Sequence, residues 1–219
     1  MKNVGIVGIG DMGSGLAKNL IKNGFSVIGL DLLEHRKLAF EAMGGQLARD
    51  YAEIGRASDA VFVMVMNGTE AKEIILGENG LAASMEKGGA ILLTATIKPT
   101  EAREIGAAMA GSGIDLIDSP VSGGFPGAQG GSLTLMAAAP ADILAKNRRV
   151  MEAVSKTIHH VGSDAGMGQT VKACLQSLIG SIFSGTFEAA ALAAKAGVSG
   201  DVLFNVVSSF NATLFSSLV

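Results

Sequence analysis

The sequence predicts an α/β fold in which a doubly wound parallel sheet precedes a long helix and the start of an all-α second domain. Short apolar runs alternate with amphipathic stretches through the first 163 residues, as in βαβ units around a parallel sheet. From Gly168 to Lys195 the pattern is apolar on nearly every side, which predicts one long helix at a domain junction or subunit interface. We therefore place one domain at 1–163 and a partial all-α domain at 164–219.

The expected strands follow one another along the chain, with one clear helix between the first two. The strands are Val4–Val7, Ser26–Leu30, Ala60–Met66, Ala90–Leu93, Asp115–Ile117, Leu133–Ala138 and Thr157–Val161. The helix is Gly13–Asn23, and we expect Gly24 to end it because glycine commonly follows the last helical residue.

Composition excludes several classes of protein. Hydrophobic residues make up 48% of the 219 residues and charged residues 17%, which provides a sizeable core and argues against disorder. A formal net charge of −3 and a single tyrosine give no basic stripe and no stacking platform, so no nucleic-acid partner is expected. The longest apolar stretch contains Gln176, Glu188 and Lys195, so we expect no membrane span. Cys174 alone allows no intrachain disulfide; we expect a buried thiol in a soluble, cytoplasmic protein.

A glycine-rich turn directly follows the first strand and opens the first helix. In Gly8-Ile9-Gly10-Asp11-Met12-Gly13, the first glycine permits a tight turn, the second lets the backbone approach a pyrophosphate, and the third allows the helix to pack on the sheet. Asp31 ends the second strand, where a carboxylate accepts hydrogen bonds from ribose hydroxyls and repels a 2′-phosphate. The unit predicts a Rossmann-type domain that binds NAD in preference to NADP. Arg36, the one nearby cation, is expected on a solvated helix face.

Further loops follow the carboxyl ends of the expected strands and should line the same crevice. Met66 and Asn67 follow the third strand, and Thr96 lies in the loop after the fourth. We expect all three to contact the cofactor. After the next strand, Ser122-Gly123-Gly124 offers a hydroxyl and backbone N–H groups to an anion, although glycine content alone also allows a loop without a ligand.

Four blocks in the same order carry a resemblance to a known family. They are Gly8 to Gly13, the Thr96–Pro99 loop, Asp118 to Gly131, and Gly166-Met167-Gly168-Gln169-Thr170-Val171-Lys172. Together they resemble the β-hydroxyacid dehydrogenases, the family of 3-hydroxyisobutyrate and tartronate-semialdehyde enzymes, across essentially the whole chain. The resemblance implies a nicotinamide dinucleotide, a substrate carboxylate bound by Ser122, Gly123 and Gly124, and Lys172 as the catalytic acid/base. A lone lysine near a helix start is ordinarily a solvated charge, but Lys172 lies in a helix expected to be buried.

Two departures from the family pattern bear on substrate and completeness. Gln176 stands where the family usually has asparagine, four residues after the lysine, which is similar to the branch acting on four-carbon sugar acids such as threonate. We expect Gln176 to contact a small hydroxy acid, with further polar contacts from Phe210–Thr213. Family members continue beyond residue 219, so we interpret the chain as C-terminally truncated. Its apolar second part predicts a homodimer or higher homo-oligomer.

Three alternatives stay open. An imine reductase shares this architecture but commonly replaces the lysine, and a phosphogluconate-type dehydrogenase needs phosphate-binding arginines in its second domain. The third is a non-enzymatic nucleotide-binding or dimerisation module. No metal site is expected, because His35, His159 and His160 show no ligand spacing with carboxylates or Cys174.

Overall fold

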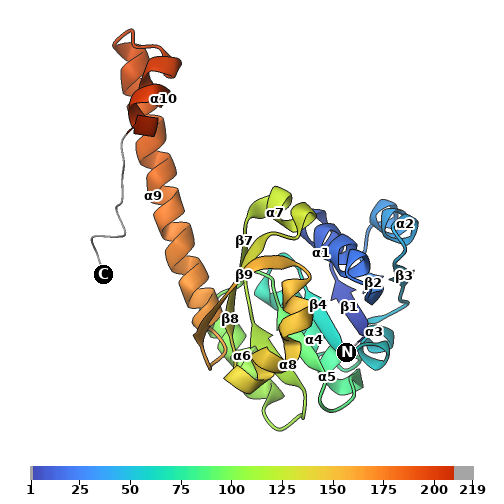
Figure 1. Ribbon diagram of the computed structural model, residues 1–219. Helices are drawn as coiled ribbons and strands as arrows, with labels where there is room; N and C mark the ends of the chain where they lie inside the picture. The colour runs from blue at the N-terminus through green and yellow to red at the C-terminus, as the bar shows by residue number, and fades with distance from the viewer. Residues whose placement is uncertain (1, 210–219) are drawn as a thin grey trace. The chain divides into compact units, whose positions relative to one another are not determined.

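The computed structural model describes residues 2–209, and a nine-stranded sheet forms its centre (Figure 1). The strands are β1 Asn3–Val7, β2 Ser26–Leu30, β3 Gln46–Leu47, β4 Ala60–Val63, β5 Ala90–Leu93, β6 Asp115–Asp118, β7 Val121–Ser122, β8 Leu133–Ala138 and β9 Ser155–Gly162. The helices are α1 Asp11–Lys22, α2 Glu34–Ala42, α3 Tyr51–Ala57, α4 Gly68–Leu76, α5 Leu81–Ser84, α6 Pro99–Met109, α7 Gly124–Gly130, α8 Ala141–Glu152, α9 Met167–Lys195 and α10 Gly200–Ser209.

The order of the strands confirms the predicted doubly wound fold. The sheet runs β3-β2-β1-β4-β5-β6-β8-β7, with β9 beside β8, and β1 to β6 are all parallel to one another. The order reverses between β1 and β4, the point at which dinucleotides bind in such sheets. At the far end β8 runs antiparallel to β6 and β7 antiparallel to β8, which the sequence did not predict. The two-residue strands β3 and β7 were also missed, because they are too short to show a periodic pattern.

Side chains alternate between the two faces of the sheet, and each face has its own core. Phe62 of β4 and Leu92 of β5 pack on the face covered by α1, α2, α7 and α8, while their neighbours Val61 and Ile91 pack under α3 to α6. Phe62 is fully buried, so its replacement by alanine should cost about 3–5 kcal/mol of folding free energy. A sheet covered on both faces explains why its strands are apolar runs rather than alternating ones.

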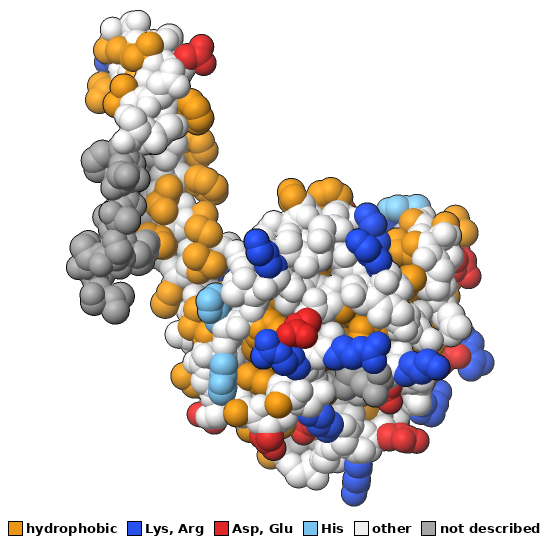
Figure 2. All heavy atoms as spheres, viewed as in Figure 1, with side chains coloured by type: hydrophobic (Ala, Val, Ile, Leu, Met, Phe, Trp, Pro, Cys, Tyr) orange, Lys and Arg blue, Asp and Glu red, His pale blue; other side chains and the backbone are white. Residues whose placement is uncertain are grey.

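The described chain divides into two compact units between Ala173 and Cys174. We expected the boundary after residue 163, which follows the last strand; the first turns of α9 nevertheless stay with the first unit. In the second unit α9 and α10 expose apolar side chains along their length (Figure 2). The exposed set includes Leu178, Ile182, Phe183, Phe187, Leu192, Val202 and Phe204.

One expectation about this helix stays a prediction and another is corrected by the structure. The long helix is present; within the described residues this chain itself buries only Gly168, Gln169 and Lys172 of α9, so the interface expected there stays a prediction. Cys174 is exposed rather than buried, because it lies beyond the turns that pack on the sheet. By length and composition alone α9 is sufficient to cross a membrane, a property that core helices of globular domains share.

Candidate active site

The loops after β1 and β4 meet at the point where the strand order reverses. Gly8 has a φ of +88°, and a side chain there would place its Cβ 2.1 Å from the Met64 carbonyl oxygen. A Cβ on Gly13 would lie 1.8 Å from the Gly8 carbonyl oxygen. Both positions therefore require glycine: Gly8 for the tight turn predicted from the sequence, and Gly13 because the helix start lies directly against the Gly8 carbonyl group.

The second glycine of the loop has a different surrounding. Gly10 is the N-cap of α1 and makes no side-chain capping bond, so the N–H groups of the first turn (Asp11, Met12, Gly13) receive no such cap. The atoms nearest to a Cβ on Gly10 would be those of the Arg36 guanidinium, at 3.4 Å, and not backbone atoms. Uncapped N–H groups at a helix N-terminus suit a pyrophosphate, so these residues fit a dinucleotide.

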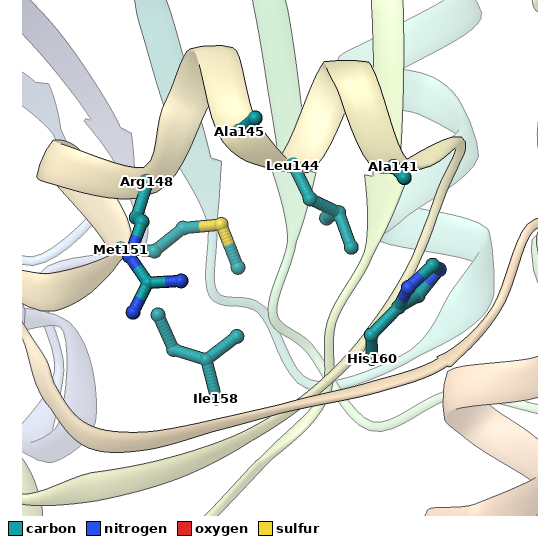
Figure 3. A pocket seen from close by; sticks show the side chains of 7 residues that line it. All are labelled: Ala141, Leu144, Ala145, Arg148, Met151, Ile158 and His160. Carbon is teal, nitrogen blue, oxygen red and sulfur yellow. The ribbon is translucent and has the colours of Figure 1, made fainter.

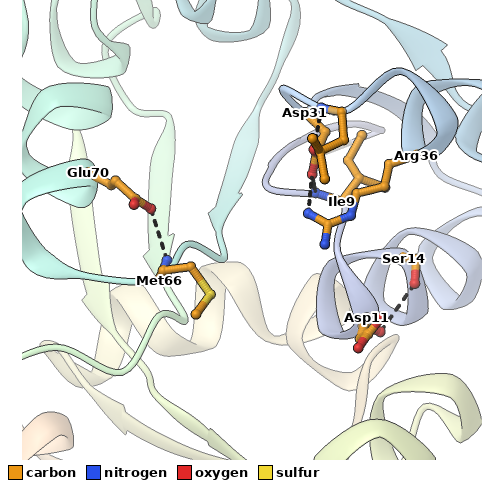
Figure 4. Close-up of polar contacts among 8 residues, drawn as sticks. Ile9, Asp11, Ser14, Asp31, Arg36, Met66 and Glu70 are labelled. Atoms are coloured by element: carbon orange, nitrogen blue, oxygen red, sulfur yellow. Dashed lines mark hydrogen bonds and ion pairs between the residues drawn. The ribbon is translucent and has the colours of Figure 1, made fainter.

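Asp31 lies beside this loop at the end of β2 and is 7% exposed (Figure 4). Its carboxylate accepts the N–H of Ile9 at 2.7 Å and the N–H of Leu33 at 2.9 Å. Arg36 Nη1 is 3.5 Å from Asp31 Oδ2, so the expectation that Arg36 lies on a solvated helix face is wrong. The guanidinium turns back over the glycine loop because Asp31 and Arg36 are five residues apart, with the start of α2 between them.

The other residues expected to contact the cofactor lie in loops at the same edge of the sheet. Asn67 caps α4: its Oδ1 accepts the Glu70 N–H at 2.9 Å, and its Nδ2 donates to Glu70 Oε1 at 2.8 Å. The Met66 side chain is exposed, while its N–H donates to Glu70 (Figure 4). Thr96 is exposed between two buried neighbours, so its side chain points out of the core. Cofactor contact by these three residues stays a prediction.

The Ser122-Gly123-Gly124 segment is ordered by packing against α1, not held as a free loop. Ser122 pairs with Thr134 of β8, and the next two residues have φ values of +126° and +58°, which glycine adopts readily. Asn19 of α1, 5% exposed, donates through Nδ2 to the carbonyl oxygens of Ala128 and Gln129 in α7. Helix α7, which begins at Gly124, is therefore bonded to α1, the helix expected to hold the pyrophosphate.

Lys172 is 8% exposed, as expected of a lysine with a role inside the fold. Burial lowers the pKa of its ammonium below the ordinary value of 10.5. Among residues 2–209 it forms no ion pair within 4 Å, so nothing offsets this effect. A lysine with a lowered pKa is better suited to exchange a proton near neutral pH than a solvated one.

A buried pair that sequence reasoning missed positions the first turn of α9. Asp118 and Gln169 are 0% and 1% exposed and bond to each other, with Gln169 Nε2 2.9 Å from Asp118 Oδ1. Asp118 and Gln169 each lie in one of the four blocks that carry the family resemblance. Nothing in the local sequence, however, indicates a contact between two residues that are 51 positions apart. Gln176 follows Lys172 by four residues on α9 and is exposed. The Phe210–Thr213 segment lies outside the described residues.

A hollow on the surface of the described chain lies away from these residues. It has a volume of about 240 Å³ between α8 and β9, with Arg148 and His160 at its edges (Figure 3). Neither element carries a predicted site residue. Within residues 2–209 no three His, Cys, Asp or Glu side chains gather in a way that would hold a metal ion.

Known proteins resemble this chain over nearly its whole length. The family described as the NAD binding domain of 6-phosphogluconate dehydrogenase matches residues 3–162. An L-threonate dehydrogenase of Escherichia coli O6:H1 is 37% identical over 94% of this chain and 68% of its own length. A 3-hydroxyisobutyrate dehydrogenase of Pseudomonas aeruginosa is 35% identical over 94% of this chain and 69% of its own.

The fold agrees with a solved structure as well. A 3-hydroxyisobutyrate dehydrogenase from Salmonella typhimurium superimposes with a TM-score of 0.86 and 32% identity, covering 99% of this chain and 76% of that one. The chain belongs to the β-hydroxyacid dehydrogenase family, whose members are NAD(P)-dependent oxidoreductases acting on small hydroxy acids.

Proposed function

We propose that this chain carries the site of an NAD-preferring dehydrogenase that oxidises a four-carbon sugar acid such as L-threonate, with Lys172 as the acid/base. The burial of Lys172 carries the proposal, because a lysine 8% exposed and without a carboxylate partner in the described residues has a lowered pKa. Two observations support the substrate class. The chain is 37% identical to an L-threonate dehydrogenase, and Gln176 stands at the position where the family usually has asparagine.

The proposed reaction divides the work among few groups. Ser122 Oγ and the N–H groups of Gly123 and Gly124 bind the carboxylate, and Gln176 orients a hydroxyl. Neutral Lys172 takes the hydroxyl proton as the carbonyl forms, and returns it in the reverse direction. A bound nicotinamide would supply the acceptor for the hydride of the substrate carbon. Gly8 to Gly13 and Asp31 would hold the dinucleotide, together with Met66, Asn67 and Thr96.

The test is turnover by the full 219-residue chain with NAD⁺ and a panel of L-threonate, 3-hydroxyisobutyrate and L-serine, followed by NADH absorbance. Lys172→Met should abolish oxidation, whereas Lys195→Met, a matched change later in α9, should not. Preference for 3-hydroxyisobutyrate would overturn the sugar-acid assignment. Oxidation of 6-phosphogluconate or reduction of an imine would favour the alternative enzymes.

A different outcome would favour a different class of protein. If NADH binds while no hydroxy acid is turned over at any pH, the chain is a nucleotide-binding or dimerisation module.

We also propose that the exposed apolar residues of α9 and α10 mediate a homodimer in the cytoplasm. Sedimentation analysis tests the homodimer directly. A monomer at all concentrations would contradict this.

A further inference from the structure

A buried hydrogen-bond cluster joins three segments at the carboxyl ends of β5 and β6. Asp118 Oδ2 accepts the N–H of Gly166 at 2.7 Å and the N–H of Gln169 at 3.2 Å. The Gln169 amide bonds back to Asp118 Oδ1 and also reaches the loop after β5. There its Nε2 donates to the Ala95 carbonyl oxygen at 3.0 Å, and its Oε1 accepts the Ile97 N–H at 3.0 Å.

The chemistry of the pair matches its surroundings at every contact. A carboxylate only accepts, and all the groups that face Asp118 are N–H donors. The amide of Gln169 points its donor at two acceptors and its acceptor at one donor, so a flipped amide would oppose like groups. Burial raises the pKa of Asp118 above its ordinary value, and the N–H donors around the carboxyl group oppose this rise without outweighing it.

The backbone around the pair leaves no room for adjustment. A Cβ on Gly168 would lie 2.6 Å from the Met136 carbonyl oxygen and 2.7 Å from that of Asp118. The first turn of α9 therefore lies directly on the ends of β6 and β8. Lys172 follows Gln169 by three residues on the same buried helix face.

We propose that Asp118 and Gln169 form a positioning pair that holds Lys172 and the Thr96 loop in one fixed arrangement for hydride and proton transfer. The inference rests on the proposed function, because it assigns the pair a purpose in that reaction. Gln169 carries the link, since its one amide bonds to both Asp118 and the residues on either side of Thr96. Neither side chain is assigned a contact with substrate or cofactor.

The central test compares Gln169→Met with Asn147→Ala. Methionine has the shape of glutamine without its hydrogen bonds, and Asn147 is a fully buried amide in α8, bonded to the Ile143 carbonyl oxygen away from the site. We expect Gln169→Met to lower kcat about 100-fold with a smaller change in the KM for hydroxy acid, because misplacement of about 1 Å costs that much. Asn147→Ala should lower Tm and leave kcat near wild type.

A second readout does not require turnover. Competitive acetylation with mass spectrometry reports the pKa of Lys172, which should move toward 10.5 in Gln169→Met as the first turn loosens. Asp118→Asn should give the same changes, and the double variant should be no worse than either single one, because both remove one unit. If Tm falls while kcat and the Lys172 pKa stay at wild-type values, the pair is only structural and the inference is wrong.

These readouts separate the inference from the proposed function. If the wild-type chain turns over no hydroxy acid, the proposed function fails. The acetylation result then still decides whether Gln169 positions Lys172. If the wild-type chain is active and Gln169→Met keeps full kcat with an unchanged Lys172 pKa, only the positioning role fails.

Discussion

The Arg36 guanidinium lies 3.5 Å from the Asp31 carboxylate and covers Gly10, so a cation and an anion share the position where the adenosine ribose is expected. Asp31 is held by two backbone N–H groups and cannot turn away. The Arg36 side chain is long and partly exposed, so it is free to move once the ribose hydroxyls bind to the Asp31 carboxylate. Cofactor preference thus depends on the pair rather than on Asp31 alone.

Asp31→Ala should weaken NADH binding and strengthen NADPH binding. The ribose hydroxyls lose a charged acceptor, which costs about 1.5–3 kcal/mol or roughly 10- to 100-fold in Kd. Arg36, released from its partner, is then available to a 2′-phosphate. Fluorescence titration measures both affinities, and Asp31→Ala/Arg36→Ala is the control that should lose the gain in NADPH. Equal weakening of both cofactors by the single variant would count against this account.

Because Lys172 is the proposed proton acceptor, the kcat for oxidation should change with pH at values below the usual pKa of lysine. Its lowered pKa means that the neutral amine accumulates below 10.5, so kcat for oxidation should rise with pH and level off before that value. Lys172→Arg keeps the charge but has no neutral form, and should lose about 100- to 10,000-fold in kcat across the profile. A pH profile identical in Lys172→Arg would remove Lys172 from the proton transfer.

The same burial predicts a gain in stability when the lysine is removed. Between the folded pKa of Lys172 and 10.5 the unfolded chain holds more protons, so stability rises with pH in that window. Below it, the cost of burying the ammonium is fully present. Lys172→Met should therefore raise Tm at neutral pH, and the advantage should shrink as the pH approaches 10.5. Calorimetry against pH measures this; a Tm below wild type throughout would contradict it.

Alanine substitutions at Gly10 and Gly13 should separate an effect on NADH binding from an effect on folding stability. Gly13→Ala forces a Cβ to 1.8 Å from the Gly8 carbonyl oxygen and should lower Tm together with NADH affinity. Gly10→Ala meets only the flexible end of Arg36 and has an ordinary φ of −71°, so Tm should stay within a few degrees. Its methyl group fills the space intended for pyrophosphate, so NADH binding should be lost. Normal NADH binding by Gly10→Ala would place the phosphates elsewhere.

A substitution at Asn19 should affect substrate binding through α7. Asn19→Leu removes the amide that donates to the carbonyl oxygens of Ala128 and Gln129; Ala128 keeps only the longer bond from the Gly131 N–H at 3.4 Å, so the change should cost about 1–3 kcal/mol. We expect the KM for hydroxy acid to rise while the Kd for NADH changes little. Asn23→Ala, one turn further along and bonded to Ala153 instead, serves as the matched change. A rise in KM for Asn23→Ala of the same size would show a general loss of α1 stability.

The elements that could be predicted from the sequence are those whose conformation depends on residues nearby in the chain. Val4–Val7 and Ala90–Leu93 are buried on both faces, and the resulting continuous apolar runs are visible without any tertiary information. The glycines at 8 and 13 were interpreted correctly for the same reason, since tight turns and helix starts depend on neighbouring residues. Asn67 shows the limit: a polar residue after a strand is also a helix N-cap, and the structure shows it capping α4.

By itself the sequence determined the α/β class, the places of β1, β2, β4, β5 and β6 along the chain, and the positions of the glycine loop, Asp31, Ser122 and Lys172. The tertiary structure alone decided that Arg36 pairs with Asp31, that β8 runs antiparallel to β6, and that Gln169 bonds to Asp118. The first set follows from periodicity and turn chemistry within a few residues. The pairing of β8 with β6 and the Gln169–Asp118 bond depend on which distant segments meet when the sheet forms, and groups 51 residues apart leave no local pattern. Arg36 and Asp31 are only five residues apart, but the direction in which the arginine side chain turns depends on the folded surroundings of α2.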